Sequence, residues 1–504
     1  MTLTMVLLSI ALLPIYLALR WPFFRLPLHM DTGFYVSNHT ICARKLRFSK
    51  GWNATYAGCS KVVPEFFYSL VYLLHGGGDN YKFYSRFYYS FYCFAVATLV
   101  GLLAYALIED GSLPYFIGLI LFCLLSSEPH YGIYFESGEQ FELLPQVLGF
   151  LWIYLGLDWN SPLLVGGGVG LWVLESYFIK LSSLPGAIIL GMGAGYFSPS
   201  SIPYSVLFSL LASAIYLWWI RYNGQSITKL LPAIIGHEVH SGHELSLKAY
   251  LKRFYSKAAL LFLISLSHPI IPVLALIGFL FSPNNMVLLL LYLGAVAVSY
   301  VIQAARVWYY TVPFLPVIAL LATFGIEVLL RQGRLGTVTC FVLLLLWIFV
   351  HGWRPYRINL EQLNRWTWLP HGSMPARNLA LDQAAVELRS MIRQDSLLVF
   401  GHYNQAYALV ETSYPTSIIA PNAWLNLMHP NWEQDFYQRL ATEPPKFILD
   451  SDLSFDSVAA KEKAGLNYKL MREFPGEFKL FGLHGIYPAI SRVVTRQDTF
   501  PAPQ

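Results

Sequence analysis

The sequence has few charged residues for its length. Only 12% of its 504 residues are Asp, Glu, Lys or Arg, whereas 56% are hydrophobic and 16% are aromatic. A soluble globular chain carries about 25% charged residues, so this composition excludes a protein built only of soluble domains. A formal net charge of +5 is too small at this length to indicate a nucleic-acid-binding protein. Abundant Tyr and Trp are typical of polytopic membrane proteins, which place these side chains at membrane interfaces.

Cysteines and phosphate-binding motifs are also scarce. The five cysteines include no CxxC pair and no Cys/His metal spacing. Cys93, Cys123 and Cys340 lie in apolar stretches and are predicted to be inert core residues, whereas a disulfide between Cys42 and Cys59 stays open. No Walker motif is present, so the chain is not an ATP-driven pump by itself. The first apolar stretch has no basic start and no cleavage site, which predicts a retained helix rather than a signal peptide.

Long apolar stretches are what the sequence has in abundance. About eleven of them are long enough, or nearly so, to cross ~30 Å of hydrocarbon. They lie near residues 1–19, 85–108, 113–127, 139–157, 163–179, 183–198, 203–220, 257–281, 284–303, 308–330 and 336–351. An odd number of crossings places all the long intervening segments on one side of the membrane. We therefore predict a mainly α, polytopic membrane module over residues 1–353, with large external loops at 28–84 and 221–256.

The chain after about residue 354 has the character of a soluble domain. Residues 399–402 (VFGH) and 446–450 (KFILD) have the pattern of short buried strands, and residues 379–393 carry apolar side chains at helical spacing. A small α/β domain over residues 354–504 is expected. Lys and Arg are concentrated in the long loops, which the positive-inside rule would place in the cytoplasm. That rule weakens for long segments, so charge alone leaves the sidedness open.

Three ionisable residues lie at predicted membrane boundaries on the side of the long loops. Asp31 follows the first apolar stretch and is a candidate general base, with an ordinary solvated carboxylate as the simpler alternative. Lys180 and Arg306 are candidates to bind a phosphate group, which Arg can do with two parallel hydrogen bonds. The simpler alternative is that both side chains extend to lipid headgroups.

Acids and histidines in the loops form two further candidate sites. Glu136, Glu139 and Glu142 precede or begin a predicted membrane helix, where a substrate or metal role competes with simple stabilisation of a helix N-terminus. A loop in segment 221–256 carries three closely spaced histidines that do not match the HExxH zinc signature. They are weak candidates for a divalent metal site: His237, His240 and His243.

Several short segments, in their order along the chain, resemble motifs of the GT-C superfamily of polytopic glycosyltransferases. The nearer likeness is to the bacterial branch related to protein O-mannosyltransferases and lipid A aminoarabinose transferases. Thr32 departs from this pattern, because relatives often carry a second acid there, and Glu65 stands in place of a second proline. The matching segments are residues 31–35 (DTGFY), 63–68 (VPEFFY), 84–87 (YSRF), 178–180 (FIK), 306–316 (RVWYYTVPFLP), 399–402 (VFGH) and 444–448 (PPKFI).

The resemblance implies a GT-C-like fold and an enzyme that transfers a sugar, with inversion, from a polyprenyl-phosphate-linked donor. The acceptor would be a hydroxyl of a glycan, lipid or protein. Asp31 would be the base, Lys180 and Arg306 would stabilise the leaving phosphate, and the remaining substrate-binding residues would be Tyr309, Glu136 and Glu139. No nucleic-acid partner is implied, and a divalent metal, the oligomeric state and the identities of sugar and acceptor stay open.

The resemblance also implies a location and leaves two alternatives. The protein would lie in the bacterial inner membrane, with its long loops and C-terminal domain on the periplasmic side, against the distribution of Lys and Arg. A transporter or flippase for a lipid-linked or sugar substrate is the main alternative, although two matched halves with broken helices are absent from the sequence. A non-catalytic membrane scaffold subunit is the other, since Thr32 replaces an acid.

Overall fold

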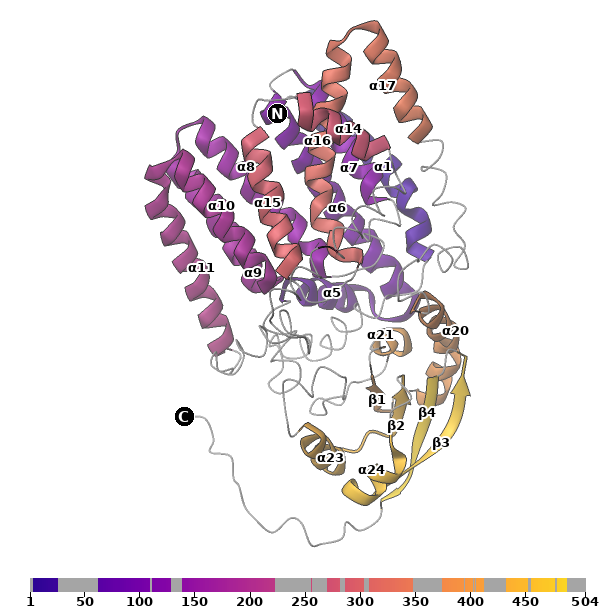
Figure 1. Ribbon diagram of the computed structural model, residues 1–504. Helices are drawn as coiled ribbons and strands as arrows, with labels where there is room; N and C mark the ends of the chain where they lie inside the picture. The colour runs from indigo at the N-terminus through magenta and orange to yellow at the C-terminus, as the bar shows by residue number, and fades with distance from the viewer. Residues whose placement is uncertain are drawn as a thin grey trace.

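The computed structural model describes residues 3–25, 62–108, 111–127, 138–222, 255, 270–281, 286–302, 308–347, 374–393, 395–401, 403, 405–411, 432–451, 455–475 and 478–486. Its N-terminal part is a bundle of apolar helices, and its C-terminal part is a small α/β domain next to one end of that bundle (Figure 1). This architecture confirms the mainly α polytopic fold with a small α/β domain that the sequence predicts.

Each predicted apolar stretch coincides with a helix over the residues that the structure describes. Within the described ranges, four helical stretches are long and apolar enough to cross a membrane, namely Gly78–Ile108, Gln140–Asp158, Pro199–Tyr222 and Thr311–Arg331, and eight shorter apolar helices accompany them. The bundle helices are α1 (Leu3–Arg20), α6 (Gly78–Ile108), α7 (Leu113–Ser126), α8 (Leu143–Asp158), α9 (Pro162–Phe178), α10 (Leu184–Phe197), α11 (Ile202–Tyr222), α14 (Ile270–Phe281), α15 (Met286–Ile302), α16 (Leu315–Arg331) and α17 (Arg334–Trp347).

Proline and glycine set the ends of these helices. Proline stands in the first turn of α7, α9, α10 and α16, where its missing N–H costs no hydrogen bond. The tight turns before α7 and between α16 and α17 use Gly111 and Gly333 at φ values of +67° and +79°, which only glycine adopts easily. Short turns therefore close the end of the bundle that lies away from the C-terminal domain, which we call the opposite end.

The other end, which we call the domain-facing end, is built differently. Helix α5 (Val62–His75) runs across it in Figure 1, and three short 3₁₀ segments interrupt the chain there. These segments are η3 (Gly138–Glu142), η4 (Leu181–Ser183) and η7 (Trp308–Phe314). Segment η3 contacts both α5 and η7, and η4 contacts α9 and α15. Irregular backbone at the end of a membrane bundle is typical of places where the protein lines a site.

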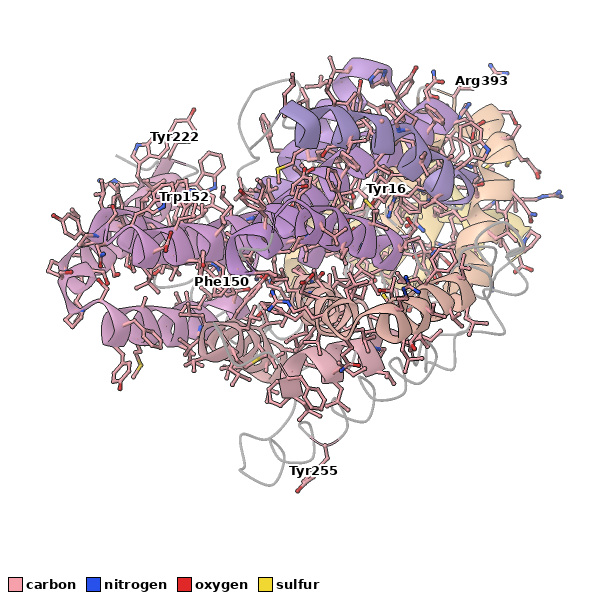
Figure 2. The ribbon with its side chains drawn as sticks, turned by 90° about the horizontal axis from the view of Figure 1, so that it is seen from above. Tyr16, Phe150, Trp152, Tyr222, Tyr255 and Arg393 are labelled. Atoms are coloured by element: carbon pink, nitrogen blue, oxygen red, sulfur yellow. The ribbon has the colours of Figure 1, made fainter. Side chains whose placement is uncertain are left out.

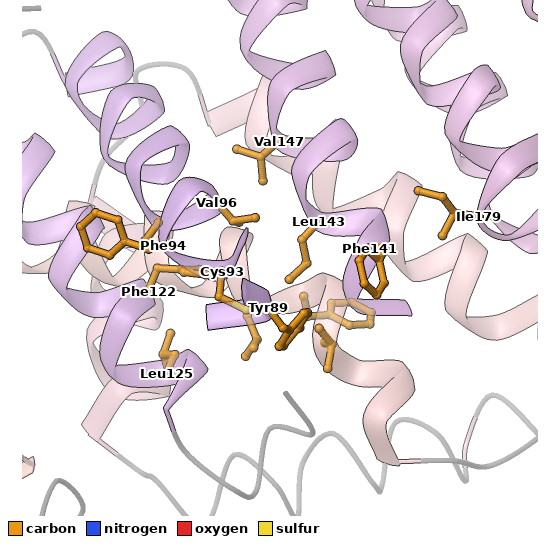
Figure 3. Close-up of a cluster of buried hydrophobic side chains, with 14 of the residues drawn as sticks. Tyr89, Cys93, Phe94, Val96, Phe122, Leu125, Phe141, Leu143, Val147 and Ile179 are labelled. Atoms are coloured by element: carbon orange, nitrogen blue, oxygen red, sulfur yellow. The ribbon is translucent and has the colours of Figure 1, made fainter. Parts of the chain in front are cut away.

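Side chains from neighbouring helices fill the interior of the bundle. Tyr16 lies among them, whereas Trp152 and Tyr222 lie on an outer edge (Figure 2) and are 37% and 48% exposed. Figure 3 shows Cys93 of α6, Phe122 of α7, and residues of η3 and α8 in one buried cluster. Cys93, Cys123 and Cys340 are buried, as the sequence predicts.

Glycines allow α14 and α16 to approach closely. A side chain added to Gly278 would meet the backbone nitrogen of Gly325 at 2.8 Å, and one added to Gly325 would meet Leu274. Van der Waals packing of this kind, rather than the hydrophobic effect, holds helices together in lipid.

The C-terminal domain is a four-stranded sheet with helices on both faces. Its elements are α20 (Met374–Ile392), β1 (Leu397–Phe400), α21 (Ala406–Val410), α23 (Trp432–Thr442), β2 (Phe447–Asp450), α24 (Ser457–Ala464), β3 (Leu466–Phe474) and β4 (Phe478–Ile486). The strand order is β1-β2-β4-β3, with β1 and β2 parallel and the other neighbours antiparallel. Strands β1 and β2 and helix α20 match the sequence prediction, whereas the sequence did not predict β3 and β4.

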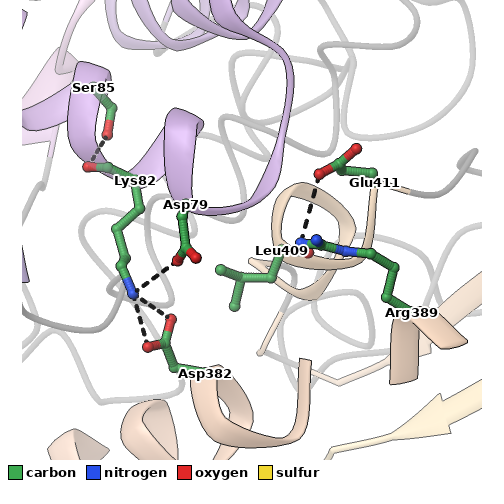
Figure 4. A network of polar contacts seen from close by, with 7 residues as sticks. All are labelled: Asp79, Lys82, Ser85, Asp382, Arg389, Leu409 and Glu411. Atoms are coloured by element: carbon green, nitrogen blue, oxygen red, sulfur yellow. Dashed lines mark hydrogen bonds and ion pairs between the residues drawn. The ribbon is translucent and has the colours of Figure 1, made fainter. Parts of the chain in front are cut away.

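Charged residues join this domain to the bundle (Figure 4). Lys82 of α6 donates to both carboxylate oxygens of Asp382 on α20, at 2.8 and 3.1 Å, and lies 3.5 Å from Asp79. Arg389 of α20 donates to the Leu409 carbonyl at 2.6 Å and lies 3.5 Å from the Glu411 carboxylate. Gly77 and Gly78 at the start of α6 lie against the same group, because added side chains there would meet Glu411 and Arg389. The domain therefore sits on the first turns of α6.

Candidate active site

The predicted site residues fall mainly in segments that the structure does not describe. Asp31, Glu136 and Arg306 lie outside the described residues, as do the three histidines of loop 221–256. Glu139 and Tyr309 lie on described backbone, in η3 and η7 respectively, and these two segments are in contact. The structure thus brings the segment that carries Glu139 into contact with the segment that carries Tyr309, although the two lie far apart in the sequence.

Lys180 is the predicted site residue whose side chain the structure describes. It follows the end of α9 with an extended backbone, at φ −160° and ψ 111°, and precedes η4. Its side chain is only 2% exposed. A lysine that reached out to lipid headgroups would keep its ammonium group in water or at the interface. The burial of Lys180 argues against that simpler alternative and places a positive charge inside the domain-facing end.

Glu142 and Lys180 are both buried and both act electrostatically on Glu175, in a region that we call the polar chamber: Glu142, Gln146, Glu175, Lys180 and Ser183. The Oε2 atom of Glu142 accepts hydrogen bonds from the Gln146 amide and the Ser183 hydroxyl, both at 3.1 Å. Although Glu142 stands at the N-cap of α8, its side chain makes no capping hydrogen bond. Its carboxylate therefore organises the chamber rather than the start of its own helix.

Glu175 is a chamber residue that the sequence interpretation missed. It lies in the last turn of α9, it is 3% exposed, and Glu142, Ser183, Gln146 and Lys180 are the groups that act on it electrostatically. Ser183 and Gln146 each donate one hydrogen bond to Glu142, and neither oxygen of Glu175 has a hydrogen-bond partner among the described residues. A carboxylate within the apolar stretch LWVLESYF was the available signal, because an acid inside a membrane helix is expensive and usually functional.

Contacts with neighbouring helices hold the chamber in place. The Trp172 indole of α9 donates to the Gln146 carbonyl of α8 at 2.9 Å. The Tyr92 hydroxyl of α6 donates to the Phe141 carbonyl at 2.8 Å and accepts from the Leu144 amide at 3.1 Å. These bonds fix the junction of η3 and α8, and with it the position of Glu142.

A second buried charged group, also missed from sequence, joins α1, α6 and α7. Arg20 is fully buried, and it donates to the Ser90 hydroxyl at 2.9 Å and to the Ser126 carbonyl at 2.6 Å. Arg20 and Arg86 both lie over the ring of Phe23, at 4.5 and 4.9 Å from its centroid. The Ser126 carbonyl is one of the unpaired carbonyls at the end of α7, so Arg20 also caps that helix.

The described residues contain no group of three or more His, Cys, Asp or Glu side chains that could hold a metal ion. Asp450, which begins an Asp-x-Asp sequence after β2, accepts a hydrogen bond from the Phe455 amide at 3.1 Å. That bond is typical of an acid that orders a turn after a strand.

Comparison with known proteins bears on the fold. No family model and no curated protein sequence matches the chain. The crystal structure of ArnT from Cupriavidus metallidurans bound to undecaprenyl phosphate does match, with a TM-score of 0.65 over 94% of this chain and 97% of the ArnT chain. The chain has the ArnT fold. The apo structure of the same ArnT matches over equal shares of both chains with a TM-score of 0.61.

The similarity to ArnT is one of fold, because only 10% of the aligned residues are identical. ArnT is a lipid A aminoarabinose transferase of the GT-C superfamily, which is the group that the sequence motifs resemble. The GT-C resemblance predicted from short motifs is therefore confirmed at the level of fold. The match extends over both the bundle and the C-terminal domain, since it leaves only a small share of either chain uncovered.

Proposed function

We propose that this protein is a membrane glycosyltransferase that takes a sugar from a polyprenyl-phosphate-linked donor. The observation that carries the proposal is the ArnT fold, because one of the matching ArnT structures has undecaprenyl phosphate bound. The buried Lys180 at the domain-facing end supports it, because a positive charge held away from water attracts a phosphate strongly.

The proposed reaction is transfer with inversion to a hydroxyl of a glycan, lipid or protein acceptor. Asp31 accepts the proton of that hydroxyl as its oxygen attacks the anomeric carbon. The bond from the anomeric carbon to the phosphate oxygen breaks, and the electron pair leaves with the lipid phosphate. Lys180 and Arg306 stabilise the charge on that phosphate. Tyr309, Glu136 and Glu139 bind substrate, in keeping with the contact between η3 and η7.

The proposed location is a bacterial inner membrane, with the long loops and C-terminal domain in the periplasm. A polyprenyl-linked donor would then reach the domain-facing end from within the lipid, with no need for a nucleotide-binding site. The absence of a Walker motif from the sequence agrees with this arrangement.

The test uses purified protein, a panel of radiolabelled polyprenyl-phosphate sugars, and wild type beside Asp31→Asn. General-base catalysis contributes about 10²–10⁴-fold, so Asp31→Asn is expected to lower turnover by that factor. Asp158→Asn is the matched control, because Asp158 is an exposed carboxylate at the opposite end. Wild-type turnover in a correctly folded Asp31→Asn protein would refute the assigned base. Substrate flux without a new glycosidic bond would point to a transporter instead.

A further inference from the structure

Several buried acceptor atoms of the polar chamber lack a hydrogen-bond donor among the described residues. Both oxygens of Glu175 and the Oε1 atom of Gln146 are buried and have no hydrogen-bond partner among the described residues. The Gln146 amide nitrogen donates one of its two hydrogens to Glu142. Exchanging the positions of the Gln146 amide nitrogen and oxygen would not satisfy these acceptors, because the Gln146 oxygen would then face the Oε2 atom of Glu142, which is also an acceptor. A buried acceptor without a donor costs about 1–3 kcal/mol, so this arrangement needs an additional hydrogen.

The described acidic groups of the chamber also outnumber its basic group. Two buried carboxyl groups, Glu142 and Glu175, lie with one ammonium group, that of Lys180. With all three ionised, these described groups carry a net charge of −1, which offsets the attraction of Lys180 for a phosphate. Two carboxylates in one buried site seldom ionise together. One proton on the pair restores neutrality and supplies the missing donor.

We propose that Glu175 and Glu142 together hold one proton, and that this proton is bound together with the phosphate of the lipid donor. Glu175 is thus a positioning residue, since it acts on the phosphate through the charge around Lys180. The inference rests on the proposed function, and it adds that donor binding depends on pH through this acid pair.

Among the residues that the structure describes, few other titratable groups interact with Glu175. Besides Glu142 and Lys180, the described titratable groups that interact with it are the phenols of Tyr92 on α6 and Tyr292 on α15. Lysine and tyrosine ordinarily titrate near pH 10, outside a range of about pH 5 to 9. Because proton and phosphate bind together, donor affinity is highest at low pH and falls as the pair loses its proton.

The experiment measures the dissociation constant of the methyl ester of undecaprenyl phosphate between about pH 5 and 9. This probe is a phosphodiester and keeps a single negative charge, whereas a phosphate monoester changes charge near pH 6. For the wild type, the dissociation constant is expected to rise by up to tenfold per pH unit, and by about 5- to 150-fold in all. Glu175→Gln, which mimics the protonated acid, should bind with no such dependence and more tightly than wild type at high pH.

Two further variants make the result specific. Glu327→Gln is the matched control, because Glu327 is a buried membrane-helix acid that pairs with Arg331 at the opposite end; it should keep the wild-type dependence. Glu175→Asp should also retain a pH dependence, since it keeps a carboxyl group in the chamber.

The outcomes separate the two proposals. Probe binding that does not vary with pH in the wild type would overturn the acid-pair proposal and leave the proposed function standing. A full pH dependence in Glu175→Gln would overturn it as well, because the proton would then lie elsewhere. Failure of the wild type to bind the probe at every pH would refute the polyprenyl-phosphate donor itself, and the acid-pair proposal with it.

Discussion

The two ends of the helix bundle differ in how many charged side chains they bury. At the opposite end, Arg331 is exposed and pairs with Glu327 one turn away, and the connecting turns are short. At the domain-facing end, Glu175 and Lys180 are buried next to interrupted helices. Removing a charge from water costs several kcal/mol, even with good partners. Of the buried charged side chains that the structure describes in the bundle, Glu327 lies at the opposite end and the others lie at the domain-facing end, so the polar chemistry is concentrated at the domain-facing end.

The largest expected effect on donor binding comes from removing the charge of Lys180 at the domain-facing end. Lys180→Met should raise the dissociation constant for undecaprenyl phosphate by about 10- to 150-fold, because a charge-assisted hydrogen bond is worth about 1.5–3 kcal/mol. Arg331→Met should leave the constant unchanged, since Arg331 lies in the turn region of the opposite end. Binding of a fluorescent polyprenyl phosphate would measure both. Equal changes in the dissociation constant for the two substitutions would contradict the assignment of phosphate binding to the domain-facing end.

A second substitution tests the stability of the domain-facing end. Arg20→Met removes the hydrogen bonds to Ser90 and Ser126 and leaves a buried carbonyl unsatisfied. We expect a loss of about 2–4 kcal/mol in the free energy of unfolding. Reversible unfolding in mixed detergent micelles would measure it. Arg334→Met, at an exposed position at the start of α17, should change the same quantity by about 0.5 kcal/mol or less. A smaller loss for Arg20 than for Arg334 would show that the buried guanidinium contributes nothing.

The smallest expected effect concerns the link between bundle and domain. Lys82→Ala and Asp382→Ala should each destabilise docking of the C-terminal domain by about 1 kcal/mol, because the pair is only partly buried. A double-mutant cycle, scored by protease cleavage of the released domain, should return a coupling of about 0.5–1 kcal/mol. Strictly additive effects of the two substitutions would mean that the ion pair does not fasten the domain.

The sequence predicts the apolar helices well and the polar end poorly, for physical reasons. A membrane helix is a local property of about 20 apolar residues, so α6, α8, α11 and α16 lie close to their predicted positions. The 3₁₀ segments η3, η4 and η7 depend on contacts with other helices and carry no local signature. Strand β3 was missed because most of its residues after Tyr468 are exposed and show no alternation of buried and exposed positions.

The candidate site was likewise predicted only in part from the sequence. Lys180 was identified because it stands between two apolar stretches at a predicted membrane boundary, but its burial depends on packing of α9 against its neighbours. Glu175 was overlooked because one acid in an apolar helix does not show which helices its side chain meets. The polar chamber is assembled from α8, the end of α9, and η4, which only the folded arrangement brings together.

The ion pair between Lys82 and Asp382 can form only late in the synthesis of the chain. Its two residues lie 300 positions apart in the chain. At a synthesis rate of about 5–20 residues per second, the ribosome needs roughly 15–60 s to travel from one to the other. During that interval Asp79, one turn away, is the acidic partner already present. Lys82 therefore gains its partner in the C-terminal domain only after residue 382 has been synthesised. A chain truncated before that residue would lack the ion pair between the bundle and the domain.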